Sequence, residues 1–139
     1  LAATTLMPGW HKAHNVPQNV IRGAICKSGI YDMESMMHAN IESKDSLKLT
    51  QDAAKRASPL YNLPKEPVPI ILAYGQHEPV GYPLEVKVYA EALRSVGQQP
   101  TVIEVADRGH FTMMNDFVHE EGKLFQALLA MLKANHQGE

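Results

Sequence analysis

Three short, largely apolar runs divide the chain. They cover residues 20–27, 69–74 and 101–106. Runs of this length without strict alternation are typical of strands buried on both faces, because helices cover both sides of a parallel sheet. The pattern therefore predicts three parallel strands joined by right-handed crossovers.

A helix is predicted between the second and third runs, over residues 84–96, because apolar positions recur there at three- and four-residue spacing. The residues on its predicted buried face are Leu84, Val88, Ala92, Leu93 and Val96. Glu85, Lys87 and Arg94 fall on the predicted exposed face. Gly97 follows where a C-terminal cap is expected.

The end of the chain is predicted to form one long helix that is capped at its start by Asn115 or Asp116. Its apolar side consists of Phe117, Leu124, Phe125, Leu128, Met131 and Leu132. Shorter helical patterns cover residues 34–41 and 51–57, and the second is ended by Ser58-Pro59.

The order of these elements predicts an α/β fold for one domain over residues 1–139. Three strands are few for such a sheet, which has about five to six on average. The sequence also opens with Leu1-Ala2-Ala3, an apolar, helix-compatible pattern without an initiator methionine. We therefore expect these residues to be the C-terminal part of a larger α/β domain.

Composition excludes several classes of partner. Thirteen basic and fifteen acidic side chains give a net charge of −2, which favours neither nucleic acid nor an anionic membrane. The apolar runs are broken within about ten residues, short of the roughly twenty that a membrane span needs. The single cysteine, Cys26, forbids an internal disulfide and favours a reducing, cytoplasmic location.

Candidate catalytic residues lie in the loops after the predicted strands, at residues 27–32, 75–79 and 106–111. In parallel sheets these loops share one edge. Glu78 lies in the second loop and His110 in the third. A histidine can take and return a proton near neutral pH, while a carboxylate holds its other ring nitrogen in the required tautomer. We therefore expect Glu78 and His110 to meet within hydrogen-bond distance.

These loops resemble a known family. A Gly-x-x-Glu turn after one strand, followed by Gly109-His110-Phe111 before the final helix, resembles the C-terminal half of an α/β-hydrolase. In that fold the acid also precedes the histidine in the chain. The more specific resemblance is to the esterase, lipase and arylformamidase group, which includes kynurenine formamidase. The stretches that carry it are residues 21–25 leading into 28–32, Ser58-Pro59-Leu60 and residues 88–93.

The resemblance implies a serine hydrolase that cleaves a small carboxylic ester or an aryl formamide, with no cofactor and no metal. His110 would be the general base and then the general acid, and Glu78 would orient it. The family usually has aspartate at this position, so Glu78 departs from the pattern. Residues 33–57 would contribute a cap over the site.

The nucleophile is absent from this sequence. No Gly-x-Ser-x-Gly motif occurs in it, and in the family the helix after that turn begins Leu-Ala-Ala, as this chain does. The resemblance therefore implies that the serine and the oxyanion loop precede Leu1. An N-terminal portion of the same protein, or a second chain, would complete the site.

Several residues have alternative interpretations. Ser28 is a rival nucleophile, although the bulky Ile30 disfavours a nucleophile turn. Asp107 is a rival acid but is better explained as a loop cap, and Asp32 as the cap of a helix that begins at Met33. His11 and His14 are spaced for a zinc site, yet no cysteine or acid is close by in the sequence.

Two further functions stay open. A catalytically silent α/β-hydrolase relative could keep the sheet and act as a binding or scaffold module. A Rossmann-like nucleotide-binding domain is disfavoured, because no Gly-x-Gly-x-x-Gly opens a helix in this sequence. The methionines at 33, 36, 37, 113 and 114 could line an apolar substrate pocket, or serve as adaptable core residues.

Overall fold

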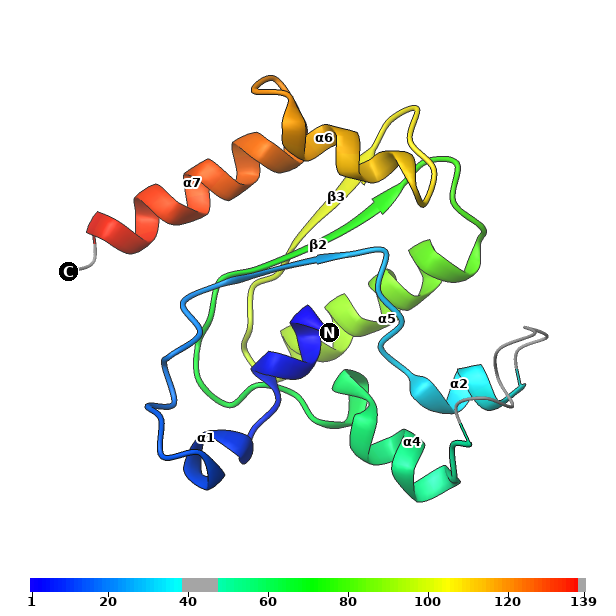
Figure 1. Cartoon of the computed structure of the whole chain (residues 1–139), viewed down its shortest axis with the longest axis vertical. Coiled ribbons are helices and arrows are strands. Elements are labelled where there is room, and N and C mark those ends of the chain that lie inside the picture. The colour runs from blue at the N-terminus through cyan, green and yellow to red at the C-terminus, as the bar shows by residue number, and fades with distance from the viewer. Residues whose placement is uncertain (39–47, 138–139) are drawn as a thin grey trace.

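The computed structural model describes residues 1–38 and 48–137. Its sheet has three parallel strands in the order β1-β2-β3: β1 (Ala24–Lys27), β2 (Ile70–Gly75) and β3 (Thr101–Val105) (Figure 1). The predicted parallel sheet is confirmed. β1 begins four residues later than its apolar run, because Pro67 and Pro69 have no N–H group with which to extend the β1–β2 ladder.

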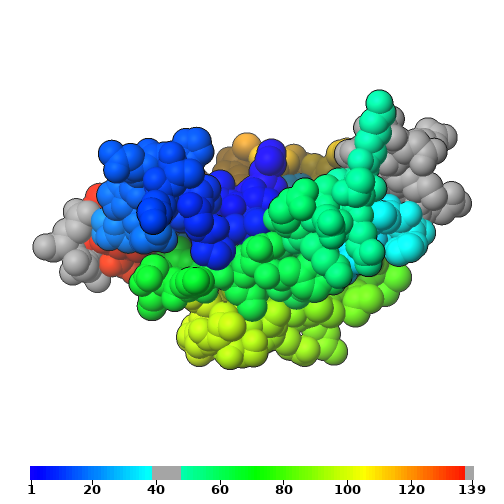
Figure 2. All heavy atoms as spheres, turned by 90° about the horizontal axis from the view of Figure 1, so that it is seen from below, coloured from blue at the N-terminus to red at the C-terminus, as the bar shows by residue number. Residues whose placement is uncertain are grey.

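Helices lie on both faces of the sheet (Figure 1). The larger part of the core lies between one face and α5 (Gly81–Ser95), where Leu72 packs with Tyr89 and Leu93. The 3-10 helix η1 (Ala2–Leu6) adds Ala3 and Leu6 to this core. Figure 2 shows these N-terminal residues, in blue, beside the green residues around α4. On this face, α5 and η1 together therefore enclose the apolar side chains of β1 and β2.

The buried face of α5 differs from the predicted one. The residues at the core are Val86, Tyr89, Ala90 and Leu93. In contrast, Leu84, Val88 and Val96 are exposed. The sheet buries the side of α5 that carries Val86 and Leu93, so Leu84 and Val88 on the adjoining side stay exposed. The prediction was wrong for Leu84, Val88 and Val96 but right for Leu93.

The C-terminal segment forms three helices rather than one. They are η3 (Thr112–Met114), α6 (Asn115–Val118) and α7 (Lys123–Gln137). The chain turns at Gly122, where a side chain would collide with the Asp116 carbonyl group. The Asp116 carboxylate then accepts a 2.6 Å hydrogen bond from the Leu124 N–H. Asp116 is therefore a helix cap, as expected, but it caps the helix that follows the break.

The segment after β1 folds back on α5. It contains α2 (Met33–His38), α4 (Gln51–Ala57) and η2 (Pro59–Tyr61). The Glu85 carboxylate of α5 accepts hydrogen bonds from the N–H groups of Tyr31 (2.8 Å) and Asp32 (3.1 Å). Asp32 in turn accepts one from Glu34 N–H at 2.8 Å, which confirms its predicted capping role. Residues 39–41 of the first predicted helical pattern lie outside the described residues.

Two remaining features complete the described fold. A short helix, α1 (Trp10–Ala13), follows η1 and leads towards β1. Across residues 1–38 and 48–137, no helix has the length and apolar character needed to cross a membrane.

Candidate active site

The turn after β2 folds a carboxylate back onto its own strand. The Glu78 N–H donates to the Gly75 carbonyl at 3.0 Å, and the Gly75 N–H donates to Glu78 Oε2 at 2.8 Å. A side chain at Gly75 would collide with the carbonyl of Arg108 in the next loop. Glycine at this position therefore lets the loops after β2 and β3 approach each other closely.

His110 lies directly against this carboxylate. Its Nδ1 is 2.7 Å from Glu78 Oε1, although the two residues are 32 positions apart in the sequence. The Glu78 side chain is 0% exposed and the His110 side chain 35% exposed. A carboxylate can only accept this hydrogen bond, so the proton is assigned to Nδ1 and Nε2 is left with a free lone pair. An imidazole in this state can act as a base.

Main-chain hydrogen bonds fix the two loops to each other. The Gln76 N–H donates to the Val105 carbonyl at 3.0 Å, and the His77 N–H donates to the Arg108 carbonyl at 2.9 Å. The Asp107 N–H donates to the Gln76 side-chain oxygen at 3.1 Å. The positions of Glu78 and His110 are thus set by the sheet and do not depend on side-chain packing alone.

Sequence reasoning assigned no role to three neighbours of His110. Lys27 Nζ donates to the His110 carbonyl at 3.1 Å, across the end of β2. The centroid of the Tyr82 ring lies 4.8 Å from the centroid of the His110 imidazole. The ring of the exposed Phe111 is perpendicular to the imidazole, with 5.2 Å between the two centroids. Lys27 ends β1 at the edge that gathers functional groups, so the sheet rule could have found it. Phe111 belongs to the Gly109-His110-Phe111 motif, whereas Tyr82 has no comparable sequence signal.

Asp107, the rival acid, lies beside His77, and Ser28, the rival nucleophile, has a buried hydroxyl group. The Asp107 carboxylate lies 3.7 Å from His77 Nε2, and both side chains are largely exposed. Ser28 has a φ of 48°, and its buried hydroxyl oxygen has no hydrogen-bond partner within the described part of the chain. A nucleophilic serine must be open to its substrate, which the Ser28 hydroxyl is not.

The histidines near the N-terminus do not form a metal site with other ligands. His11 is buried and His14 is exposed. The described residues contain no group of three or more His, Cys, Asp or Glu side chains placed to hold a metal ion.

The burial of Cys26 gives its thiol an unusual environment on β1. Its side chain is part of the core next to Tyr31, and burial raises the pKa of the thiol to about 11. Burial also raises the pKa of Tyr31 and Tyr89. The neutral forms of all three groups are therefore favoured in the folded protein.

Comparison with solved structures defines the class of fold. Esterase 2 of Thermogutta terrifontis, phosphonylated by sarin, aligns with 80% of this chain and 43% of its own, with a TM-score of 0.60 and 16% identity. A puromycin hydrolase aligns with 78% of this chain and 16% of its own, with a TM-score of 0.60 and 18% identity. The chain has the fold of the C-terminal portion of an α/β-hydrolase.

A curated protein is similar in sequence as well. The kynurenine formamidase of Danio rerio is 29% identical to this chain over 137 residues. The match covers 95% of this chain but 45% of that protein, so the chain spans about half the length of this relative. No family model matches the chain.

Proposed function

We propose that this chain is the part of a serine hydrolase that carries the histidine and the acid, and that its substrate is a small carboxylic ester or an aryl formamide. The observation that carries the proposal is the 2.7 Å contact between His110 Nδ1 and the buried Glu78 carboxylate. The similar proteins, which are named as an esterase, a puromycin hydrolase and a kynurenine formamidase, support it.

In this mechanism His110 Nε2 removes the proton from a serine hydroxyl while the serine oxygen attacks the carbonyl carbon. The Glu78 carboxylate stabilises the imidazolium through Nδ1–H. His110 then returns the proton to the departing alcohol or amine, and an acyl-serine remains. A water molecule, activated by the same nitrogen, releases the carboxylic acid and restores the serine.

The serine is proposed to come from outside these 139 residues. The sequence has no Gly-x-Ser-x-Gly motif, and the Ser28 hydroxyl is closed to solvent. An N-terminal portion of the same protein or a second chain would supply both the serine and the oxyanion-binding N–H groups.

Residues 33–57 are proposed to form part of a cap that shapes the substrate site. They follow the carboxyl end of β1, and the Ser35 hydroxyl in their first turn donates to the Glu85 carboxylate of α5 at 3.2 Å. Residues 39–47 of this segment lie outside the described part of the chain.

A cytoplasmic location is proposed as well. The single cysteine and the burial of its thiol support it, because such a protein neither needs nor forms internal disulfides.

The decisive experiment compares the 139-residue chain with the same chain extended by the residues that precede Leu1 in its gene. Both are treated with a fluorophosphonate probe and assayed on p-nitrophenyl acetate and an aryl formamide. We expect labelling and hydrolysis by the extended protein only. His110→Ala should lower its kcat on the order of 10⁴-fold or more, because the general base is lost.

His119→Ala is the matched control, since His119 is exposed and lies outside the site. It should leave hydrolysis unchanged. An extended protein with no Gly-x-Ser-x-Gly motif and no labelling would reject the proposed hydrolase and favour the catalytically silent binding or scaffold module.

A further inference from the structure

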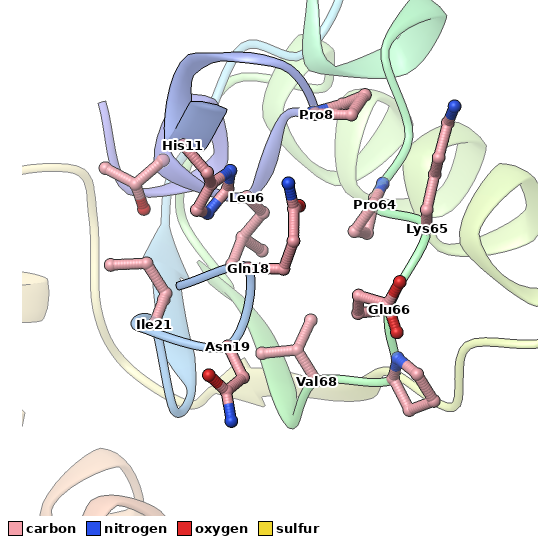
Figure 3. Close-up of a pocket in the computed structure, with 12 residues that line it drawn as sticks. Leu6, Pro8, His11, Gln18, Asn19, Ile21, Pro64, Lys65, Glu66 and Val68 are labelled. Atoms are coloured by element: carbon pink, nitrogen blue, oxygen red, sulfur yellow. The ribbon is translucent and has the colours of Figure 1, made fainter. Parts of the chain in front are cut away.

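A cavity lies at the end of the sheet where β1 and β2 begin (Figure 3). Two of its lining residues, Ile21 and Val68, precede β1 and β2, whereas Glu78 and His110 follow β2 and β3. The hydrolytic mechanism proposed above uses none of the residues that line it. Any function of this cavity is therefore separate from the catalytic edge.

Hydrogen bonds hold both walls of the cavity in place. On one side, Gln98 is 5% exposed; its Oε1 accepts from the Val68 N–H at 3.2 Å and its Nε2 donates to the Glu66 carbonyl at 2.9 Å. On the other side, the Trp10 ring N–H donates to the Thr5 carbonyl at 3.0 Å. Because its walls are fixed in this way, the cavity is formed before any ligand arrives, as is usual for small-molecule sites.

The size of the cavity limits the ligand. It has an empty volume of about 400 Å³, which includes space at its open mouth. This volume lies at the lower end of the range for small-molecule sites, so the ligand must be small.

His11 is the buried polar group of the cavity. It is 4% exposed and is stacked on Trp10 with 4.0 Å between ring centroids. Its Nδ1 is shielded and has no hydrogen-bond partner within residues 1–38 and 48–137. A buried orphan N–H group is rarer in proteins than an under-satisfied acceptor, so the favoured tautomer has its proton on Nε2. His11 then offers a donor to a ligand, which must present an acceptor.

The mouth of the cavity supplies further donors. Figure 3 shows His11, Leu6 and Gln18 along one wall, and Pro64, Lys65 and Glu66 across from them. The Gln18 amide and the Lys65 ammonium are exposed groups that can attract an anion. Glu66 is the one acid among the lining residues, and it is as exposed as Lys65, so salt screens both charges and the buried His11 supplies the main donor.

From these observations we propose that the cavity binds a short aliphatic carboxylate. Its carboxylate oxygens would accept hydrogen bonds from His11 and Gln18, with Lys65 adding attraction at the mouth. Its short alkyl chain would lie against Leu6, Ile21 and Val68.

The test is an NMR titration of the 139-residue chain with propionate, propionamide and propylammonium at about pH 7, where propionate is ionised. Sodium chloride keeps the ionic strength constant. Propionate should shift the His11 ring signals saturably, with a Kd in the millimolar range that is at least about tenfold lower than that of propionamide. Propylammonium should give no saturable shift. His14 is exposed at the C-terminal cap of α1 and should not respond.

Two variants locate the binding site. His11→Phe keeps an aromatic ring against Trp10 but removes both nitrogens, so it should weaken propionate binding at least about tenfold, while the matched His14→Phe should not. Lys65→Gln changes an exposed side chain and should weaken binding by about two- to threefold without affecting the fold.

Saturable binding that is equally tight for all three probes, or no saturable shift with any of them, would overturn the proposal. Unchanged propionate affinity in His11→Phe would do the same. If His11→Phe does not fold, the comparison of the three probes and the Lys65→Gln titration decide the question.

Discussion

At the scale of single residues, the glutamate at the acid position is explained by its hydrogen bonds. The longer side chain of Glu78 reaches back to the Gly75 N–H with one oxygen and meets His110 with the other. Both oxygens of a fully buried carboxylate are thus paired, which offsets the cost of removing the charge from water. The extra methylene group lets the carboxylate fold back far enough to reach the main chain of its own strand.

Replacing Glu78 by glutamine tests its role in orienting His110. The amide keeps the shape but loses the charge that holds the proton on Nδ1, so a mixture of His110 tautomers is expected. Long-range ¹H–¹⁵N spectra of the 139-residue chain measure this directly. In the extended enzyme, kcat should fall on the order of 10³–10⁴-fold. Glu120→Gln, an exposed control, should change neither quantity, and an unaltered His110 tautomer in Glu78→Gln would contradict the assignment.

Cys26 makes the stability of the fold sensitive to alkaline pH. Burial raises the pKa of its thiol from an ordinary value of 9.0 to about 11. Below pH 9 the thiol is protonated in both states, but between these two values only the unfolded chain releases the proton, so stability falls as the pH rises. At pH 10 this loss is on the order of 1 kcal/mol.

Urea unfolding at about pH 7 and pH 10 measures this loss. In Cys26→Ala the fall should be smaller by about that amount, while Tyr31 and Tyr89 still contribute in both proteins because burial raises the pKa of each. The same fall in both proteins would show that Cys26 has no part in it.

At the scale of elements, α5 shows how a neighbouring strand decides which side of a helix is buried. Two sets of apolar positions run along this helix. The set with Val86 and Leu93 faces the sheet, while the set with Leu84 and Val88 is exposed. Spacing alone predicts that α5 is amphipathic, but the choice between the two sets depends on which side of the helix packs on the sheet.

Paired truncations on α5 distinguish the two faces. Leu93→Ala should lower the free energy of unfolding by about 2–5 kcal/mol, because Leu93 is completely buried and its loss leaves a cavity. Val88→Ala should cost less than about 1 kcal/mol, because Val88 is 42% exposed. Equal losses in urea unfolding of the two variants would mean that the assigned face is wrong.

At the scale of the whole molecule, the sheet is paired on one side of β1 only. Within the described residues the strand order is β1-β2-β3, so the outer edge of β1 has no neighbouring strand. An unpaired strand edge is a site where another strand can add. The chain also spans about half of the kynurenine formamidase to which it is similar. Both facts favour completion of this edge by further polypeptide.

If further polypeptide completes the sheet at β1, the chain extended by the residues that precede Leu1 should be more stable than the 139-residue chain. Its urea m-value should also be larger, because more surface is buried on folding. Circular dichroism during urea unfolding gives both quantities. An extended protein in which the 139-residue part unfolds separately, with an unchanged midpoint and m-value, would exclude completion of the sheet at β1.

The sequence by itself determined the elements whose signals are local. The three apolar runs predicted the parallel strands, and Gly97 marked the end of α5, where it takes a φ of 87°. The rule that loops after parallel strands share one edge was enough to expect Glu78 and His110 together. These features follow from side-chain spacing and backbone geometry along a few residues, so no tertiary information was needed.

Only the tertiary structure decided which surfaces are covered and which distant groups meet. The buried face of α5, the Lys27 contact with the His110 carbonyl and the burial of His11 all depend on segments far apart in the chain. The same is true locally at Asp116, whose cap on α7 requires the turn at Gly122. Burial and non-local hydrogen bonds arise from packing between elements, and the spacing of residues within one element does not contain that information.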